Sequence, residues 1–193
     1  MKKTLQAAMI LMVLTALPAA SAAAQGKVSI DTERSTLTVY VYRSGVFSFA
    51  GDDHEIRVPI ASGSIDETGR NVELTVQAAQ MRVMDPKLDA GKRAEVQEKM
   101  LSPEGLDAER YRDIAFRSTS VEARNQNEWL VHGNLTLHGE TRPIELLVSR
   151  VQGQFRGETT LKQTNFGMKP IRVAGGTVKV KDEVKIVFAI FPR

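Results

Sequence analysis

The sequence predicts an all-β domain with one inserted α-helix, and three observations support this prediction. Apolar and polar residues alternate in short runs over most of the chain after residue 25, as expected for half-buried strands. Gly, Asn and Asp residues separate these runs, which is typical of turns. One stretch has helical spacing instead. This combination favours an antiparallel sheet that is closed on itself or folded into a sandwich.

The clearest strand signal is the segment 131–148. From 131 to 137 the odd positions carry Val, Gly, Leu and Leu, and the even positions carry His, Asn and Thr. After a turn at 138–140 the alternation resumes up to Val148. Two such runs joined by a short Gly-containing turn predict a β-hairpin with one apolar face. The residues that this parity assigns to the interior are Leu135, Leu137, Ile144 and Leu146.

The remaining strands are predicted by the same rule. Most intervening positions carry Thr, Arg, Glu, Lys or Gln, and a short strand is expected around Val28 and Ile30. We find no internal repeat and no linker that would divide the domain. Named by their first and last apolar residues, the longer runs are Leu37–Val41, Ile56–Ile60, Val72–Val76, Ile114–Phe116, Phe155–Leu161 and Val184–Ile190.

The helix is predicted over residues 89–100. This stretch is rich in helix formers, and Val96 and Met100 share one face because they are four residues apart. Asp89 is a suitable N-cap, and Ser102-Pro103 is expected to end the helix. Such a helix can cap the mouth of a barrel or pack along its outside.

The first 24 residues are expected to be a cleaved signal peptide. Lys2 and Lys3 precede an apolar stretch, 7–17, that is too short to span a bilayer, and small residues follow with candidate cleavage sites near 22–24. The mature domain is then 25–193, in the periplasm or outside the cell. The chain has no Cys, which excludes disulfides and thiolate chemistry.

The charge excludes one class of partner. The net charge of +3 falls to +1 without Lys2 and Lys3, because 24 of the 26 basic residues then remain, against 23 acidic residues. A nucleic-acid-binding protein would show a clustered basic face. We therefore expect no nucleic-acid partner.

Few residues suit catalysis. His132 and His138 have outward parity and lie roughly 20 Å apart along one strand, so they cannot share a metal. Asp52, Asp53 and His54 form the one cluster of metal-ligand types, but Zn²⁺ requires three or four converging ligands, and an Asx-type turn explains the same residues. We expect no enzyme activity, no metal and no cofactor, with a metal-assisted enzyme as a distant alternative.

Four motifs resemble those of the YceI-like family. Gly133–Pro143 reads G-N-L-T-L-H-G-E-T-R-P, and Tyr111–Ser118 matches a Y-P-x-I-x-F-x-S strand with Arg112 in place of Pro. Asn165–Met168 resembles D-F-G-I, and Lys181–Val184 opens the last strand. The resemblance covers essentially the whole mature chain, in the right order.

The resemblance implies an extended, lipocalin-like antiparallel barrel around an apolar tunnel. Some members of this family bind polyisoprenoid chains. The chain is thus expected to be a non-enzymatic carrier or store for a long apolar lipid, such as an isoprenoid quinone, a polyprenyl lipid or a fatty-acid-type chain. The expected ligand-binding residues are Val39, Val41, Phe47, Phe49, Ile56, Val58, Phe116, Leu135, Leu137, Ile144, Leu146 and Phe166.

Two further expectations concern the head and the interior of this barrel. Basic residues near strand ends are candidates to bind a polar headgroup, chiefly Arg82, Arg142 and Arg172, with Arg43 and Lys162 also considered. Small residues with inward parity suggest empty space, namely Gly133, Ser118, Ser120, Gly157 and Thr159.

The alternative to a lipid carrier is a filled barrel that acts as an interaction module for a protein partner or a second copy. The same apolar residues would then pack solidly. Transient membrane contact and a homodimer are open alternatives for either function.

Overall fold

The computed structural model describes residues 26–44, 53–68, 70–173 and 178–193. The expected signal segment 1–24 lies outside the described residues. So do Phe47, Phe49 and Asp52.

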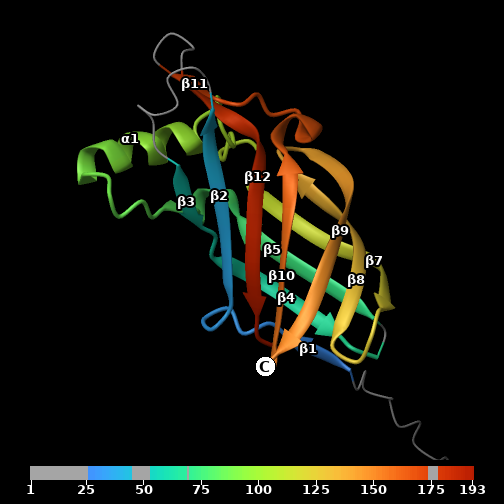
Figure 1. Cartoon of the computed structure of the whole chain (residues 1–193). Helices are drawn as coiled ribbons and strands as arrows, with labels where there is room; N and C mark the ends of the chain where they lie inside the picture. Colours follow the sequence, from blue (N-terminus) through green and yellow to red (C-terminus); the bar gives the residue numbers. More distant parts are fainter. Residues whose placement is uncertain (1–25, 45–52, 69, 174–177) are drawn as a thin grey trace, which may run out of the picture.

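One curled antiparallel sheet makes up most of the described chain, which confirms the predicted fold class (Figure 1). Its order is β1-β4-β5-β7-β8-β9-β10-β12-β2-β3-β6, and β11 pairs with β12. The strands are β1 (Lys27–Ser29), β2 (Thr36–Ser44), β3 (His54–Arg57), β4 (Ile60–Asp66), β5 (Asn71–Gln77), β6 (Arg82–Val83), β7 (Asp113–Ala123), β8 (Glu128–Leu137), β9 (Glu140–Val151), β10 (Gln154–Lys162), β11 (Arg172–Val173) and β12 (Val178–Ile190).

Within the part of the chain that the structure describes, a backbone bridge joins the two sides of the curled sheet. Ile30, directly after β1, pairs with Pro192, directly after β12. The backbone N–H of Asp31 also donates to the carbonyl oxygen of Phe191 at 2.8 Å. Because β1 pairs with β4 and β12 pairs with β10, this bridge joins the two sides of the sheet. Strands β2, β3 and β6 extend from β12 beyond the closed ring.

The predicted hairpin is confirmed as β8 and β9. The pairing runs from Glu128 opposite Ser149 to Leu137 opposite Glu140, so only two residues form the turn. His138 and Gly139 both have positive φ, 52° and 78°, as a type I′ turn requires. The hairpin therefore has the register that its alternation predicts.

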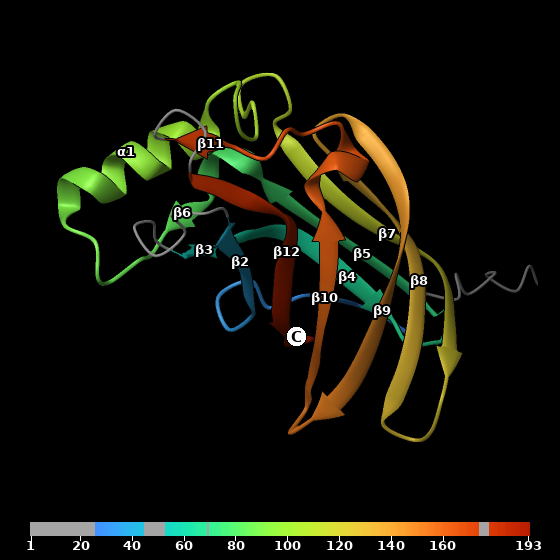
Figure 2. The ribbon, with the colours of Figure 1, turned by 45° about the horizontal axis from the view of Figure 1, so that its top comes forward.

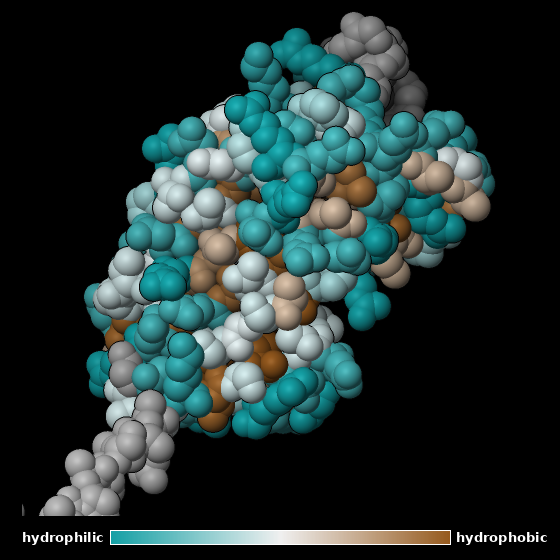
Figure 3. All heavy atoms as spheres, turned by 180° about the vertical axis from the view of Figure 1, so that it is seen from behind, coloured by the Kyte–Doolittle hydropathy of each residue, from teal (hydrophilic) through white to brown (hydrophobic). Residues whose placement is uncertain are grey.

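The face of the molecule shown in Figure 3 carries mostly polar residues, with apolar residues visible between them. His132 has outward parity on β8, and its ring nitrogens lie 3.5 Å and 3.2 Å from the carboxylates of Glu122 and Glu145. His138, in the turn, contacts the ring of Tyr111, with centroids 4.4 Å apart. Both histidines thus have structural neighbours outside the barrel.

Helix α1 (Ala90–Leu101) begins and ends one residue later than the predicted range 89–100, with the predicted N-cap at Asp89. The Asp89 carboxylate accepts a hydrogen bond from the N–H of Lys92 at 2.9 Å, and this bond holds the pKa of Asp89 below its usual range. Ser102 is the C-cap. No helix among the described residues is long and apolar enough to cross a membrane.

The helix lies beside β6, at one end of the barrel (Figure 2). The Gln97 side chain accepts from the N–H of Val83 at 2.8 Å and donates to the carbonyl oxygen of Met81 at 2.9 Å. These bonds satisfy backbone groups on the edge strand, which would otherwise be open to pairing with another chain. The described residues also form the short 3-10 turns η2 (Ala78–Gln80) and η3 (Gln163–Phe166).

Candidate ligand-binding cavity

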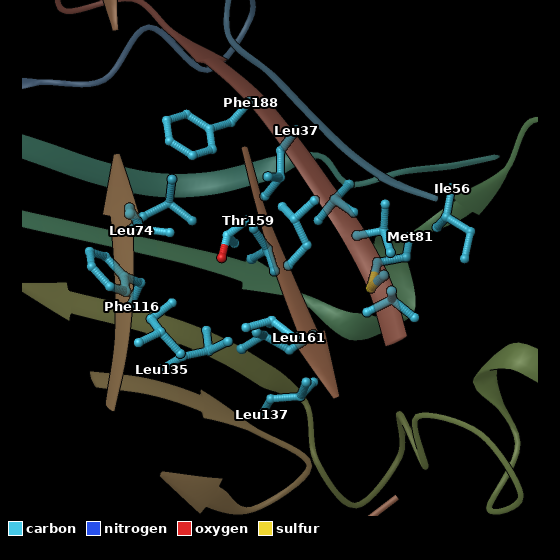
Figure 4. A pocket seen from close by; sticks show the side chains of 18 of the residues that line it. Leu37, Ile56, Leu74, Met81, Phe116, Leu135, Leu137, Thr159, Leu161 and Phe188 are labelled. Atoms are coloured by element: carbon cyan, nitrogen blue, oxygen red, sulfur yellow. The ribbon is translucent and has the colours of Figure 1, made fainter. Parts of the chain in front are cut away.

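The interior of the barrel holds a cavity of about 760 Å³. Side chains from strands on all sides of the barrel point into one space, among them Leu37, Leu74, Phe116 and Phe188 (Figure 4). Pockets for small ligands are roughly 300–1,000 Å³ and mostly apolar, so this cavity has the size and character of a ligand site. An open interior counts against the alternative of a filled barrel.

Strand alternation builds the cavity wall. On β8 the odd-numbered residues Val131, Leu135 and Leu137 point into the cavity. Each of them is paired with a residue of β7, of β9 or of both. Because successive side chains of a strand point to opposite faces, the predicted parity transfers directly to the wall. The predicted ligand-binding residues that line the cavity are Val39, Val41, Ile56, Val58, Phe116, Leu135, Leu137, Ile144 and Leu146.

Phe166 is placed differently from the expectation. It is only 1% exposed and lies in η3, outside the cavity wall. The β9–β10 ladder stops at Leu147 and Glu158, and η3 contacts both strands beyond that point. Phe166 packs there against the apolar cluster that includes Leu161 and Val184. The expectation that it contacts ligand is therefore corrected to a packing role.

The three main headgroup candidates also lie away from the cavity wall. The Arg82 guanidinium donates to the carbonyl oxygens of Ala79 and Met81, at 2.7 Å and 2.8 Å. Arg172 is exposed on β11. The expectation that a basic residue near a strand end points into the cavity is therefore wrong for these side chains.

Arg142 has inward parity on β9 but lies where that strand has parted from β10. Its guanidinium donates to the carbonyl oxygen of Asn165 and to the Glu140 carboxylate, both at 3.0 Å. The expected headgroup role of Arg142 is corrected to a link between β9 and η3. Lys162, together with Arg142 and Phe166, lines a second hollow beside η3.

Other polar residues line the end of the cavity next to α1. We call this part of the wall, formed by Arg43, His54, Lys99, Met100 and Lys179, the α1 end. Arg43 was a lesser candidate from its position near a strand end, while Lys99 and Lys179 were missed. Lys99 lies three residues after Val96, on the same helical face, so helical spacing could have identified it.

The opposite end of the cavity has a different composition. We call it the Trp129 end, formed by Glu67, Arg70, Val121, Trp129 and Phe155. The two ends are separated along β12, because Arg43 pairs with Val180 and Phe155 pairs with Ile190. The rings of Trp129 and Phe155 meet edge to face, with centroids 5.7 Å apart.

The small inward residues do not simply leave empty space. Phe116 lies over Gly133 and Phe188 lies over Gly157, so closely that a Cβ at either glycine would collide with the ring. The glycines thus allow aromatic rings to lie against the wall. Of the small residues, Thr159 does line the cavity (Figure 4).

The structure also corrects the expectation that Ser118 and Ser120 leave empty space in the interior. The buried Ser118 hydroxyl accepts from the N–H of Val72 at 2.7 Å and donates to Asn71 at 3.1 Å. Ser120 is exposed, because a bulge between Ser118 and Ser120 adds one residue to β7 and reverses the parity. A bulge shifts every later side chain to the other face, which is why Val121 lines the cavity instead.

The two described residues of the Asp-Asp-His cluster, Asp53 and His54, have different partners. Asp53 accepts from the backbone N–H of Arg43 at 3.0 Å, whereas His54 Nδ1 lies 2.6 Å from Oδ2 of Asp85. Over the ranges that the structure describes, no group of three or more His, Asp or Glu side chains has a geometry that could hold a metal ion.

Sequence comparison places the chain among proteins of known family. A family model described as YceI-like domain matches residues 28–191. A UPF0312 protein of Shewanella putrefaciens is 29% identical over 181 residues, which cover 88% of this chain and 89% of that protein. A UPF0312 protein of Shewanella baltica is 26% identical over 179 residues, with the same coverage.

Solved structures support the same fold. BcnA of Burkholderia cenocepacia superposes with a TM-score of 0.60 at 17% identity, covering 83% of this chain and 98% of that one. A mutant YCEI protein of Campylobacter jejuni gives 0.51 at 13% identity, covering 79% and 85%. At such identities these structures establish the architecture and leave the ligand to be argued from the cavity.

Proposed function

The chain belongs to the YceI-like family, and from that premise we propose that it is an exported, non-enzymatic binding protein for a long apolar lipid. The lipid is held inside the barrel for transport or storage. The family and the fold are consistent with a barrel that binds an apolar ligand. The ligand class that fits best is a single chain of isoprenoid or fatty-acid type.

The observation that carries the proposal is the apolar cavity inside the curled sheet. Its volume is about 760 Å³ and its wall is mostly Val, Leu, Ile and Phe. The side chains that line an apolar cavity lack the dispersion contacts of a packed core. An apolar ligand in the cavity would supply these contacts. A lipid chain that runs from the α1 end to the Trp129 end would contact inward-facing side chains of the strands that line the cavity.

Energetics place the selectivity in shape and headgroup. Burying a methylene from water is worth about 0.8 kcal/mol, but a membrane lipid is already buried before transfer. The transfer of the lipid tail from the bilayer to the cavity therefore changes its free energy very little. Shape fit and contacts to the polar head then decide which lipid is held.

Export is part of the proposal and rests on the N-terminal segment. Fractionation of the native host, with sequencing of the mature N-terminus, tests it directly. We expect the protein in the periplasm or the medium, starting near residues 22–25. A protein that keeps Lys2 and Lys3 and stays in the cytoplasm contradicts export.

Lipid extraction tests the binding proposal. Protein purified from its own host without detergent is extracted with organic solvent, and the extract is analysed by mass spectrometry. We expect one class of long-chain lipid in near-stoichiometric amount. A barrel that is always empty, and that takes up no prenyl or fatty-acid-type lipid when these are added, contradicts the proposal.

A further inference from the structure

A hydrogen-bonded His–Asp pair lies at the α1 end of the cavity. His54, on β3, lines the cavity and its side chain is 20% exposed. Its Nδ1 lies 2.6 Å from Oδ2 of Asp85. Asp85 lies between β6 and α1 and its side chain is only 6% exposed. The lipid-binding proposal gives no role to this buried carboxylate.

Both oxygens of the Asp85 carboxylate accept hydrogen bonds. Oδ2 faces His54 Nδ1, and Oδ1 accepts from the backbone N–H of Glu55 at 2.7 Å. A carboxylate can only accept, so the proton of a neutral His54 ring must be on Nδ1. The other ring nitrogen, Nε2, is then an acceptor, and it forms no hydrogen bond with any described residue.

We infer that the His54–Asp85 pair selects the headgroup of the lipid by presenting Nε2 as a hydrogen-bond acceptor at the α1 end. The head that this acceptor recognises is a hydroxyl, as in a lipid alcohol or a phenol. A ketone, an ether or an ester lacks the proton that Nε2 accepts. This inference rests on the proposed function, because it requires a lipid in the cavity.

The surrounding charges support a neutral hydroxyl over an acidic head. Arg43 lies beside Asp53, and Lys99 Nζ lies 2.9 Å from the Glu104 carboxylate. Two of the cations at the α1 end thus already have acidic neighbours. Lys179 is exposed, so it can remain in water when a lipid is bound. Among the titratable groups at this end, the His54 ring is the one held by a buried partner, the Asp85 carboxylate.

Replacing Asp85 by Asn gives a specific test of this geometry. The N–H of Glu55 would hold the amide oxygen of Asn at the Oδ1 position, so the amide NH₂ would face His54 Nδ1. That nitrogen must then accept, and the ring proton moves to Nε2. Nε2 becomes a donor, which binds the oxygen of an alcohol and of an ether equally well.

The experiment compares farnesol, an isoprenoid alcohol, with farnesyl methyl ether on delipidated full-length mature protein. Titrations at about pH 8.5 are followed by the fluorescence of Trp129, the single tryptophan. We expect the wild-type protein to bind the alcohol about tenfold more tightly than the ether. The ratio should fall to about one in Asp85→Asn and in His54→Phe.

The control is His132→Phe on the outer face, which should keep the wild-type ratio. If Asp85→Asn does not fold, His54→Phe decides alone. Equal affinities in wild type, or a preference retained in His54→Phe, would overturn headgroup selection while the lipid-binding proposal stands. Tighter binding of farnesoic acid than of farnesol would assign the head to the cations and also overturn it. If neither farnesol nor the ether binds, both proposals fail.

Discussion

The two ends of the cavity hold their polar groups in opposite ways. At the α1 end, the Asp85 carboxylate is buried and both of its oxygens accept hydrogen bonds. At the Trp129 end, Glu67 and Arg150 form an ion pair at 3.4 Å that is 49% and 40% exposed. The first of these two sites therefore has a buried carboxylate in fixed geometry, whereas the second brings the rings of Trp129 and Phe155 together beside an exposed ion pair.

This difference gives the cavity a direction. A polar head gains most where a buried carboxylate fixes the orientation of its partner, since a mobile surface charge contributes little. An apolar tail gains most beside Trp129 and Phe155. We therefore expect the head at the α1 end and the tail at the Trp129 end.

The largest expected effect comes from blocking the cavity between its ends. Thr159 lies on β10 and its side chain points into the cavity (Figure 4). Thr159→Trp should abolish detectable lipid binding, because the indole would occupy the space of the chain. Binding is measured by lipid extraction. The matched control is Thr160→Trp, since Thr160 is the next residue and is exposed; loss of binding in both variants would contradict the account.

The next largest effect is expected at the Trp129 end. Trp129→Ala should lower the free energy of unfolding by about 3 kcal/mol, because it removes the edge-to-face contact with Phe155 and leaves a void. Urea unfolding followed by circular dichroism measures the change. Leu130→Ala, one residue later and on the other face, should cost clearly less. Equal costs would mean that the indole does not close this end.

A smaller effect is expected from the buried carboxylate. Asp85→Ala should lower the free energy of unfolding by about 2 kcal/mol, since the N–H of Glu55 and the His54 ring lose their acceptor. Chemical denaturation measures it, with Asp53→Ala as the exposed comparison. A change no larger than that of Asp53→Ala would show that the pair is not structurally fixed.

The smallest effect is expected for the exposed ion pair at the Trp129 end. Glu67→Ala should change the free energy of unfolding by no more than about 0.5 kcal/mol, because water screens such pairs. Its lipid affinity should match wild type. A loss above about 1 kcal/mol would remove the contrast between the two ends.

The walls of the cavity could be predicted from the sequence, whereas its polar end could not. Alternation is a local property, so the inward parity of Leu135 and Ile144 followed from the chain alone. The parity prediction failed at Ser120 because a bulge inserts one residue into β7, and the pattern of residue types does not reveal the bulge.

The His54–Asp85 contact depends on tertiary structure. The two residues are 31 positions apart, and they meet only because β6 pairs with β3. Arg142 and Phe166 were misplaced for a related reason, since the parting of β9 from β10 is not encoded in either strand's alternation. Such features depend on how strands pair over long distances.

Native mass spectrometry of wild-type protein and Thr159→Trp, both purified without detergent from the native host, shows directly whether the cavity holds a lipid. We expect wild type to carry one lipid per chain, released on collisional activation, and Thr159→Trp to be folded and to carry none. A wild-type protein that flies only at the mass of its polypeptide, even after incubation with prenyl and fatty-acid-type lipids, would contradict the lipid-binding proposal.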